Sequence, residues 1–184
     1  EGIGRLETIQ GANGGLRYVP SLSDDKLKAL QETLANKLSD PARILGGSFL
    51  YTSDLMFDGQ LTRSMGTYFA GKFANLNADY IVTVETKGIS LAADVAFMMN
   101  IPLVVVRREA KYSEGSTVSI NYFSGSYDRI QKMSISKRAV EPNKHAIIID
   151  DFMRGGGSLK GVSEILSEFE IEVVGAGVAI ASRE

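Results

Sequence analysis

The residues best suited to chemistry lie in one run, 146–159, which reads AIIIDDFMRGGGSL. Its β-branched start predicts a strand buried on both faces, ending in Asp150 and Asp151. A glycine-rich turn from Arg154 follows, and Ser158 then opens a helix. Glycines let backbone N–H groups close on a phosphate, and a helix N-terminus adds a positive dipole. Because adjacent carboxylates repel phosphate, we interpret them as acceptors for sugar hydroxyls. The run predicts a site for ribose 5-phosphate. The alternative is a plain strand-to-helix turn.

Two further loops follow predicted strands. The loop 85–88 (ETKG) comes after an apolar strand at 81–84 and precedes a helix. The basic run 107–111 (RREAK) comes after the strand at 103–106, and three cations at a strand end suit a ligand with several negative charges. The alternatives are a simple turn with a helix cap and a solvated basic turn. Since loops at the carboxyl ends of parallel strands meet at one edge, all three segments predict one site.

The elements that position these loops alternate between strand and helix. That order predicts a parallel α/β sheet flanked by helices. Leucines recur every three or four residues in the first helix, which Ser23 caps. We expect helices at 24–38, 61–76, 89–99 and 162–169, and strands at 46–52, 81–84, 103–106, 146–149 and 173–180.

Two segments stand apart from this alternation. Two β-prone runs flank a glycine-rich turn over Gly4 to Val19 and predict a hairpin. The polar stretch 108–138 is long for a connection in a compact domain, so we interpret it as a mobile hairpin lid with arms at 119–123 and 130–135.

Length and composition restrict the class of protein. The 184 residues suit one α/β domain with a small appendage, and the net charge of −2 shows no basic footprint. There is no cysteine and a single histidine, His145, so disulfides, thiolate metal sites and two-histidine metal sites are excluded. No apolar run approaches the roughly 20 residues of a membrane helix, and we infer a cytoplasmic protein. We expect a piece of a longer chain, truncated at its C-terminus.

The 148–159 motif resembles the phosphoribosyl-pyrophosphate motif of type I phosphoribosyltransferases. The resemblance implies that fold, with the acid pair on the ribose 2- and 3-hydroxyls and the turn on the 5-phosphate. It implies that loop 85–88 binds pyrophosphate through backbone N–H groups, often with unusual peptide geometry, and that Mg²⁺ accompanies the ligand. The enzymes usually carry Thr-Thr-Gly where this chain has Arg154-Gly155-Gly156. This departure argues against transferase activity more than against binding. The predicted ligand-binding residues are Tyr51, Thr86, Lys87, Gly88, Arg107, Lys111, Asp150, Asp151, Phe152, Arg154, Gly155, Gly156, Gly157 and Ser158.

Within this group the chain is most similar to the purine operon repressors of Gram-positive bacteria. The similarity includes Glu114 to Tyr122 and the string 148–153 (IIDDFM). It implies a homodimeric repressor of purine biosynthesis genes, with phosphoribosyl pyrophosphate as effector and guanine-nucleotide alarmones as competitors. Residues 1–20 would be the wing of a truncated winged-helix domain, with Arg5 and Arg17 on DNA phosphates, and 21–184 the effector domain. An ordinary surface hairpin is the alternative for the wing. The alternative function is a catalytic purine or orotate phosphoribosyltransferase.

Two aromatic side chains have competing interpretations. Phe152 covers the ribose or a purine base, or belongs to the core. Tyr51 matches an aromatic position that approaches the ligand in the family. His145 precedes a strand and suits a solvated or capping role, and no nucleophile–base pair is visible in the sequence.

Overall fold

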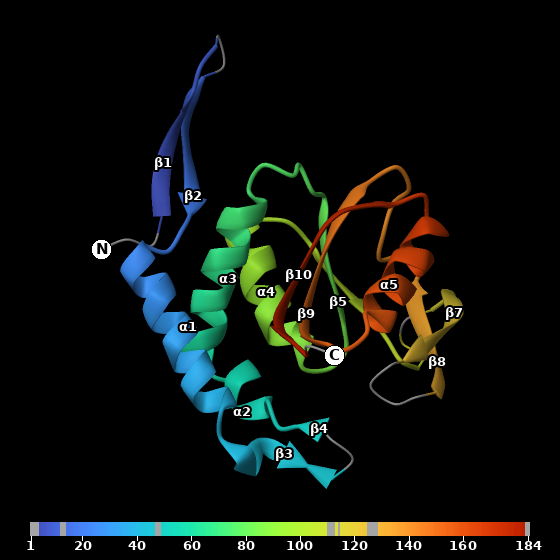
Figure 1. Cartoon of the computed structure of the whole chain (residues 1–184). Coiled ribbons are helices and arrows are strands. Elements are labelled where there is room, and N and C mark those ends of the chain that lie inside the picture. The colour runs from blue at the N-terminus through green and yellow to red at the C-terminus, as the bar shows by residue number, and fades with distance from the viewer. Residues whose placement is uncertain are drawn as a thin grey trace.

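The centre of the molecule is a four-stranded parallel sheet with helices on both sides (Figure 1). The computed structural model describes residues 4–11, 14–46, 49–109, 113, 115–124 and 129–182. The strand order is β10-β9-β5-β6, and each neighbouring pair is parallel. These strands are β5 (Tyr80–Val84), β6 (Leu103–Val106), β9 (His145–Met153) and β10 (Glu172–Ala181). The predicted parallel α/β sheet is confirmed.

Alternate residues along the strands face two separate cores. Ile81 and Ile147 point to one side, where α1 (Asp24–Leu38), α2 (Ser53–Met56), α3 (Gly59–Phe73) and α4 (Gly88–Met99) contribute apolar side chains. Val82 and Ile148 point to the other side, against α5 (Gly157–Ser167). Because both faces are covered, the central strands are almost entirely apolar, which is why they could be recognised in the sequence.

The caps define the helix limits. Helix α1 begins after Ser23, whose hydroxyl accepts the Lys26 N–H, as expected. Helix α3 was predicted at 61–76 but starts at Gly59, because the Asp58 carboxylate accepts the N–H groups of the first turn. It ends at Phe73, shortly before Asn77 adopts a left-handed conformation. Helix α5 starts at Gly157, one residue before Ser158, which was predicted to open a helix, and it replaces the range predicted at 162–169.

The predicted hairpin within 108–138 is present as β7 (Thr117–Ser124) and β8 (Arg129–Ser136). Its inner face is part of a core: Tyr122, Met133 and Ile135 are all buried and pack against the α5 side of the sheet. A bridge between Arg107 and Ser134 joins the hairpin to the end of β6. These apolar side chains contribute to that core, and the interpretation of the hairpin as a mobile lid stays a prediction.

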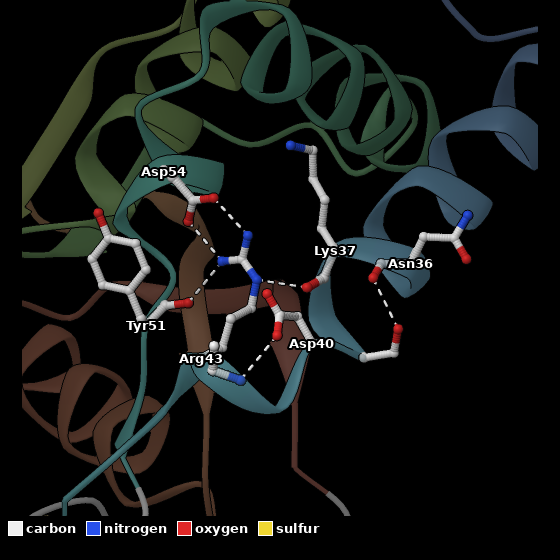
Figure 2. A network of polar contacts seen from close by, with 8 residues as sticks. Asn36, Lys37, Asp40, Arg43, Tyr51 and Asp54 are labelled. Atoms are coloured by element: carbon white, nitrogen blue, oxygen red, sulfur yellow. Dashed lines mark hydrogen bonds and ion pairs between the residues drawn. The ribbon is translucent and has the colours of Figure 1, made fainter.

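The strand predicted at 46–52 is present in part, as β4 (Phe49–Leu50). It pairs with β3 (Ile44–Leu45), which follows a 3₁₀ turn at Pro41–Arg43. Arg43 anchors both ends of this small hairpin (Figure 2). Its guanidinium donates to the Lys37 and Tyr51 carbonyl oxygens at 2.5 and 3.0 Å, and to both Asp54 carboxylate oxygens at 2.7 and 2.6 Å. The β3–β4 hairpin is thus tied to the end of α1 and to α2.

The N-terminal hairpin of β1 (Gly4–Ile9) and β2 (Gly15–Pro20) projects from the body of the molecule (Figure 1). Arg5 and Arg17 lie on one face of it, and both form ion pairs with Glu7, at 2.9 and 2.6 Å. These two guanidinium groups hold the pKa of Glu7 below its usual value. None of the helices in the described ranges is long and apolar enough to cross a membrane.

Candidate functional site

A pocket of about 260 Å³ lies beyond the carboxyl ends of β5 and β9. This is where ligands bind in open parallel sheets. Its walls come from the β3–β4 hairpin and the residues after it, the end of β5 and the loop that follows, Arg108 after β6, Ser124 at the end of β7 (Thr117–Ser124), and the end of β9 with the first turn of α5. The lining residues are Phe49, Leu50, Thr52, Val84, Glu85, Thr86, Lys87, Arg108, Ser124, Asp150, Asp151, Phe152, Arg154 and Ser158.

The two carboxylates of the acid pair differ in environment. The sequence predicted that the strand ends at the acid pair. Strand β9 instead continues through Met153, so the pair lies within the sheet. Asp150 is only 6% exposed and forms the buried part of the pocket wall, whereas Asp151 is half-buried. Burial, and then the charge of Asp151, raises the pKa of Asp150 to about 8. The Asp150 carboxylate still accepts the Asp151 N–H at 3.0 Å.

Gly88, the first residue of α4, allows the loop 85–88 to approach Asp150. A Cβ at position 88 would lie 2.5 Å from the Thr83 hydroxyl and 2.8 Å from Asp150 Oδ1. Any larger residue would push the loop or the carboxylate aside. The Glu85–Thr86 peptide bond in this loop is cis. Gly88 therefore contributes by its small size, next to the acid pair.

The glycine turn after β9 forms the opposite end of the pocket. Gly155 and Gly156 have φ values of +66° and +72°, in the left-handed region that side chains disfavour. This conformation favours glycine at both positions of the turn. Helix α5 starts at Gly157 with no side chain capping its first N–H groups, and Ser158 and Arg154 line the pocket. The uncapped first turn can donate backbone N–H groups to an anion.

Cationic side chains line the other wall. Lys87 Nζ lies 3.3 Å from the hydroxyl of the buried Thr52. Arg108 lines the pocket, and its backbone N–H donates to the Glu85 carboxylate at 2.7 Å. Arg107 instead pairs its guanidinium with that carboxylate at 3.2 Å. The pocket lining thus combines carboxylates and a bare backbone turn with the cations Lys87, Arg108 and Arg154.

The structure brings together most of the predicted ligand residues. Thr86, Lys87, Asp150, Asp151, Phe152, Arg154 and Ser158 all line the one pocket. Gly156 lines a small adjoining hollow, and Gly88 abuts Asp150. Five of the predicted residues that the structure describes are outside both linings: Tyr51, Gly88, Arg107, Gly155 and Gly157. Lys111 lies outside the described residues. Arg5 and Arg17 lie on the projecting hairpin, at the other end of the molecule from β3–β4 (Figure 1).

Sequence reasoning missed lining residues of two kinds. Phe49, Leu50 and Thr52 reach the pocket from the β3–β4 hairpin, and no motif marked that segment. Arg108 lies in the pocket wall where Arg107 had been chosen. The strand period could not distinguish these two arginines, because β6 is apolar at all four positions. The bridge to Ser134 at Arg107 also has no local signal in the sequence.

Comparison with known proteins defines the class. Residues 60–184 match the phosphoribosyl transferase domain, so the chain belongs to that family. Adenine phosphoribosyltransferase from Saccharomyces cerevisiae has the same fold, with a TM-score of 0.71, 20% identity, and coverage of 84% of this chain and 90% of the enzyme. The predicted type I phosphoribosyltransferase fold is confirmed.

The relatives found by sequence form a narrower group than the fold family. The chain is 43% identical over 180 residues to the purine biosynthesis transcriptional repressor PurR of Bacillus subtilis, covering 98% of the chain and 63% of the repressor. It is 35% identical to the purine biosynthesis transcriptional activator PurR of Lactococcus lactis, covering 97% of the chain and 66% of the activator. Xanthine phosphoribosyltransferase of Laribacter hongkongensis is 29% identical, with 81% of each chain covered. The chain thus spans somewhat less than two thirds of the regulators' length.

Proposed function

We propose that the pocket binds phosphoribosyl pyrophosphate. The observation that carries this proposal is that Asp150 and Asp151, an uncapped glycine turn, and the cations Lys87 and Arg108 come together in one pocket. Asp151 and Asp150 accept the ribose hydroxyls. The turn and Arg154 hold the 5-phosphate, and the two cations hold the pyrophosphate. A plain strand-to-helix turn would not require cations from two other loops at the same place.

Phosphoribosyl pyrophosphate usually carries Mg²⁺, and the pocket residues are compatible with this ion. Carboxylate oxygens are donors that this ion accepts, and Asp150 and Asp151 supply them in the pocket wall. Among the described residues, no three His, Cys, Asp or Glu side chains gather to hold a metal. The ion is therefore expected to enter with the ligand and to be held mainly by ligand oxygens and water.

Calorimetric titration of the protein with phosphoribosyl pyrophosphate and Mg²⁺ tests the binding proposal. We expect saturable binding to the wild type and none to Asp151→Ala, whose fold should be intact because the side chain is half-buried and not part of either core. Asp25→Ala, on the exposed start of α1, serves as the control. Unchanged affinity in Asp151→Ala contradicts the proposal.

We propose further that the chain is the effector-binding part of a homodimeric transcriptional repressor of purine biosynthesis genes. The similarity to the two PurR regulators supports it, at higher identity than the xanthine enzyme. In this proposal residues 1–20 are the wing of a winged-helix domain, residues 21–184 are the effector domain, and Arg5 and Arg17 exchange Glu7 for DNA phosphates. Such a protein acts in the cytoplasm.

Fluorescence anisotropy with the full-length protein and DNA from a purine biosynthesis promoter tests this function. We expect specific binding that phosphoribosyl pyrophosphate changes, and competition by a guanine-nucleotide alarmone for the same pocket. Arg5→Ala and Arg17→Ala should weaken DNA binding and reduce its salt dependence. Sedimentation should give a dimer. Binding to the promoter that is indifferent to the effector contradicts the regulatory role.

A catalytic phosphoribosyltransferase is the second candidate. Membership in the family and the xanthine enzyme's similarity favour it. The turn Arg154-Gly155-Gly156 speaks against it, because it lacks the hydroxyl donors that the enzymes carry. Pyrophosphate release should be measured with adenine, guanine, xanthine and orotate. We expect none above background, and turnover with any of these bases would reject a purely regulatory role.

A further inference from the structure

The β7–β8 hairpin contacts both the helix that follows the glycine turn and the pocket residue Arg108, and the proposed function assigns no role to these contacts. On the phosphate side, Tyr122 of β7 packs on α5, the helix that follows the glycine turn. A Cβ at Gly161 of α5 would lie 3.0 Å from both Cβ and Cγ of Tyr122. The ring of Tyr122 is 5% exposed and belongs to the core under the sheet. The hairpin is therefore held firmly against the helix that carries the glycine turn.

On the cationic side, Gln131 of β8 joins the hairpin to Arg108. The Gln131 amide oxygen accepts two hydrogen bonds, from the Tyr122 hydroxyl at 3.0 Å and from Arg108 Nη1 at 2.6 Å. Tyr122 and Gln131 are cross-strand partners, so their side chains leave the hairpin on the same face. Arg108 Nε also donates to the Glu85 carbonyl oxygen at 3.2 Å. Two N–H groups of the guanidinium are thus directed at oxygens fixed by the fold.

We propose that Gln131 is a positioning residue, which holds Arg108 in the orientation that meets the anionic ligand and so couples the β7–β8 hairpin to binding. The inference rests on the proposed anion-binding function and names the residue that prepares the site for it. An arginine that is already oriented loses less side-chain freedom when the anion arrives. An amide oxygen orients the guanidinium without neutralising it, as a carboxylate would.

The test is a double-mutant cycle on ligand affinity. Wild type, Gln131→Met, Arg108→Met and the double variant are titrated with inorganic pyrophosphate and with phosphoribosyl pyrophosphate, each with Mg²⁺. Losing one charged hydrogen bond corresponds to about a tenfold loss of affinity. We expect Gln131→Met to weaken both ligands by about that factor, and the double variant to bind no more weakly than Arg108→Met. A residue with a purely structural role would give losses that multiply.

Asn121→Met is the matched control, since it makes the same amide-to-thioether change at an exposed position of β7 beside Tyr122. Its affinity should equal that of the wild type. If thermal unfolding shows that Gln131→Met is not folded, Gln131→Leu, which also lacks an acceptor, takes its place. Unchanged affinity in the folded variant, or multiplied losses, overturns the inference. If the protein binds inorganic pyrophosphate but not phosphoribosyl pyrophosphate, the proposed function is overturned, and the cycle with pyrophosphate still tests the role of Gln131. Binding of neither overturns both.

Discussion

Replacing Asp150 with asparagine should stabilise the protein, and increasingly so as the pH rises. The pKa of Asp150 is raised from 3.8 to about 8 by burial and then by the charge of Asp151. The folded state therefore holds the proton more tightly than the unfolded chain. This carboxyl contributes stability that is complete below about pH 4 and is lost as the pH rises to 8. Asparagine has nearly the same shape as the protonated acid but does not ionise.

The size of the effect follows from the separation of the two pKa values. Each pH unit between them corresponds to about 1.4 kcal/mol, so the advantage of Asp150→Asn should be small at pH 4 and reach on the order of 5 kcal/mol above pH 8. Urea unfolding of both proteins at pH 5, 6, 7, 8 and 9 measures it. Asp25→Asn, at an exposed carboxylate, should give a profile parallel to that of the wild type. A constant difference between Asp150→Asn and the wild type across the series would refute the reasoning.

Three further changes have expected outcomes. Arg154→Ala should weaken phosphoribosyl pyrophosphate by about 1.5–3 kcal/mol in calorimetry if its side chain donates a charged hydrogen bond to the phosphate, and an unchanged Kd would exclude that contact. Gly88→Ala should lower the unfolding temperature and abolish ligand binding, because its Cβ would lie 2.5 Å from the Thr83 hydroxyl. Gly59→Ala, with nothing within 4 Å of a Cβ, should do neither. Arg43→Met should release the β3–β4 hairpin, seen as faster proteolytic cleavage there at unchanged α3 protection, and equal cleavage rates would contradict this.

The central sheet was predictable from the sequence because its strands are buried on both faces. The runs at 81–84, 103–106 and 146–149 needed only their apolar, β-branched character to be recognised. The extension of β9 to Met153 was not predictable in this way. The acid pair interrupts the apolar run, and the strand continues past it because Phe152 and Met153 pair with Ile180 and Ala181 of β10. Only the partner strand reveals that continuation.

The candidate site was predictable where a motif lies in one stretch of chain and not where it depends on packing. Asp150, Asp151 and the glycine turn follow one another in sequence, so their spacing was enough. The contribution of Leu50 and Thr52 depends on the hydrogen bonds of Arg43 that anchor the hairpin. Long-range contacts of this kind have no local signature.

The position of Asp150 connects the stability of the fold to the chemistry of the site. A buried carboxyl beside a second carboxylate opposes ionisation, and an amide there would serve the fold better. An acid at this position is explained if the ligand supplies hydrogen-bond donors to the carboxylate. Sugar hydroxyls that donate to the carboxylate favour its charged form, so binding acts against the same burial that raises the pKa. In the proposed function, occupancy of the pocket and the protonation of Asp150 are therefore linked.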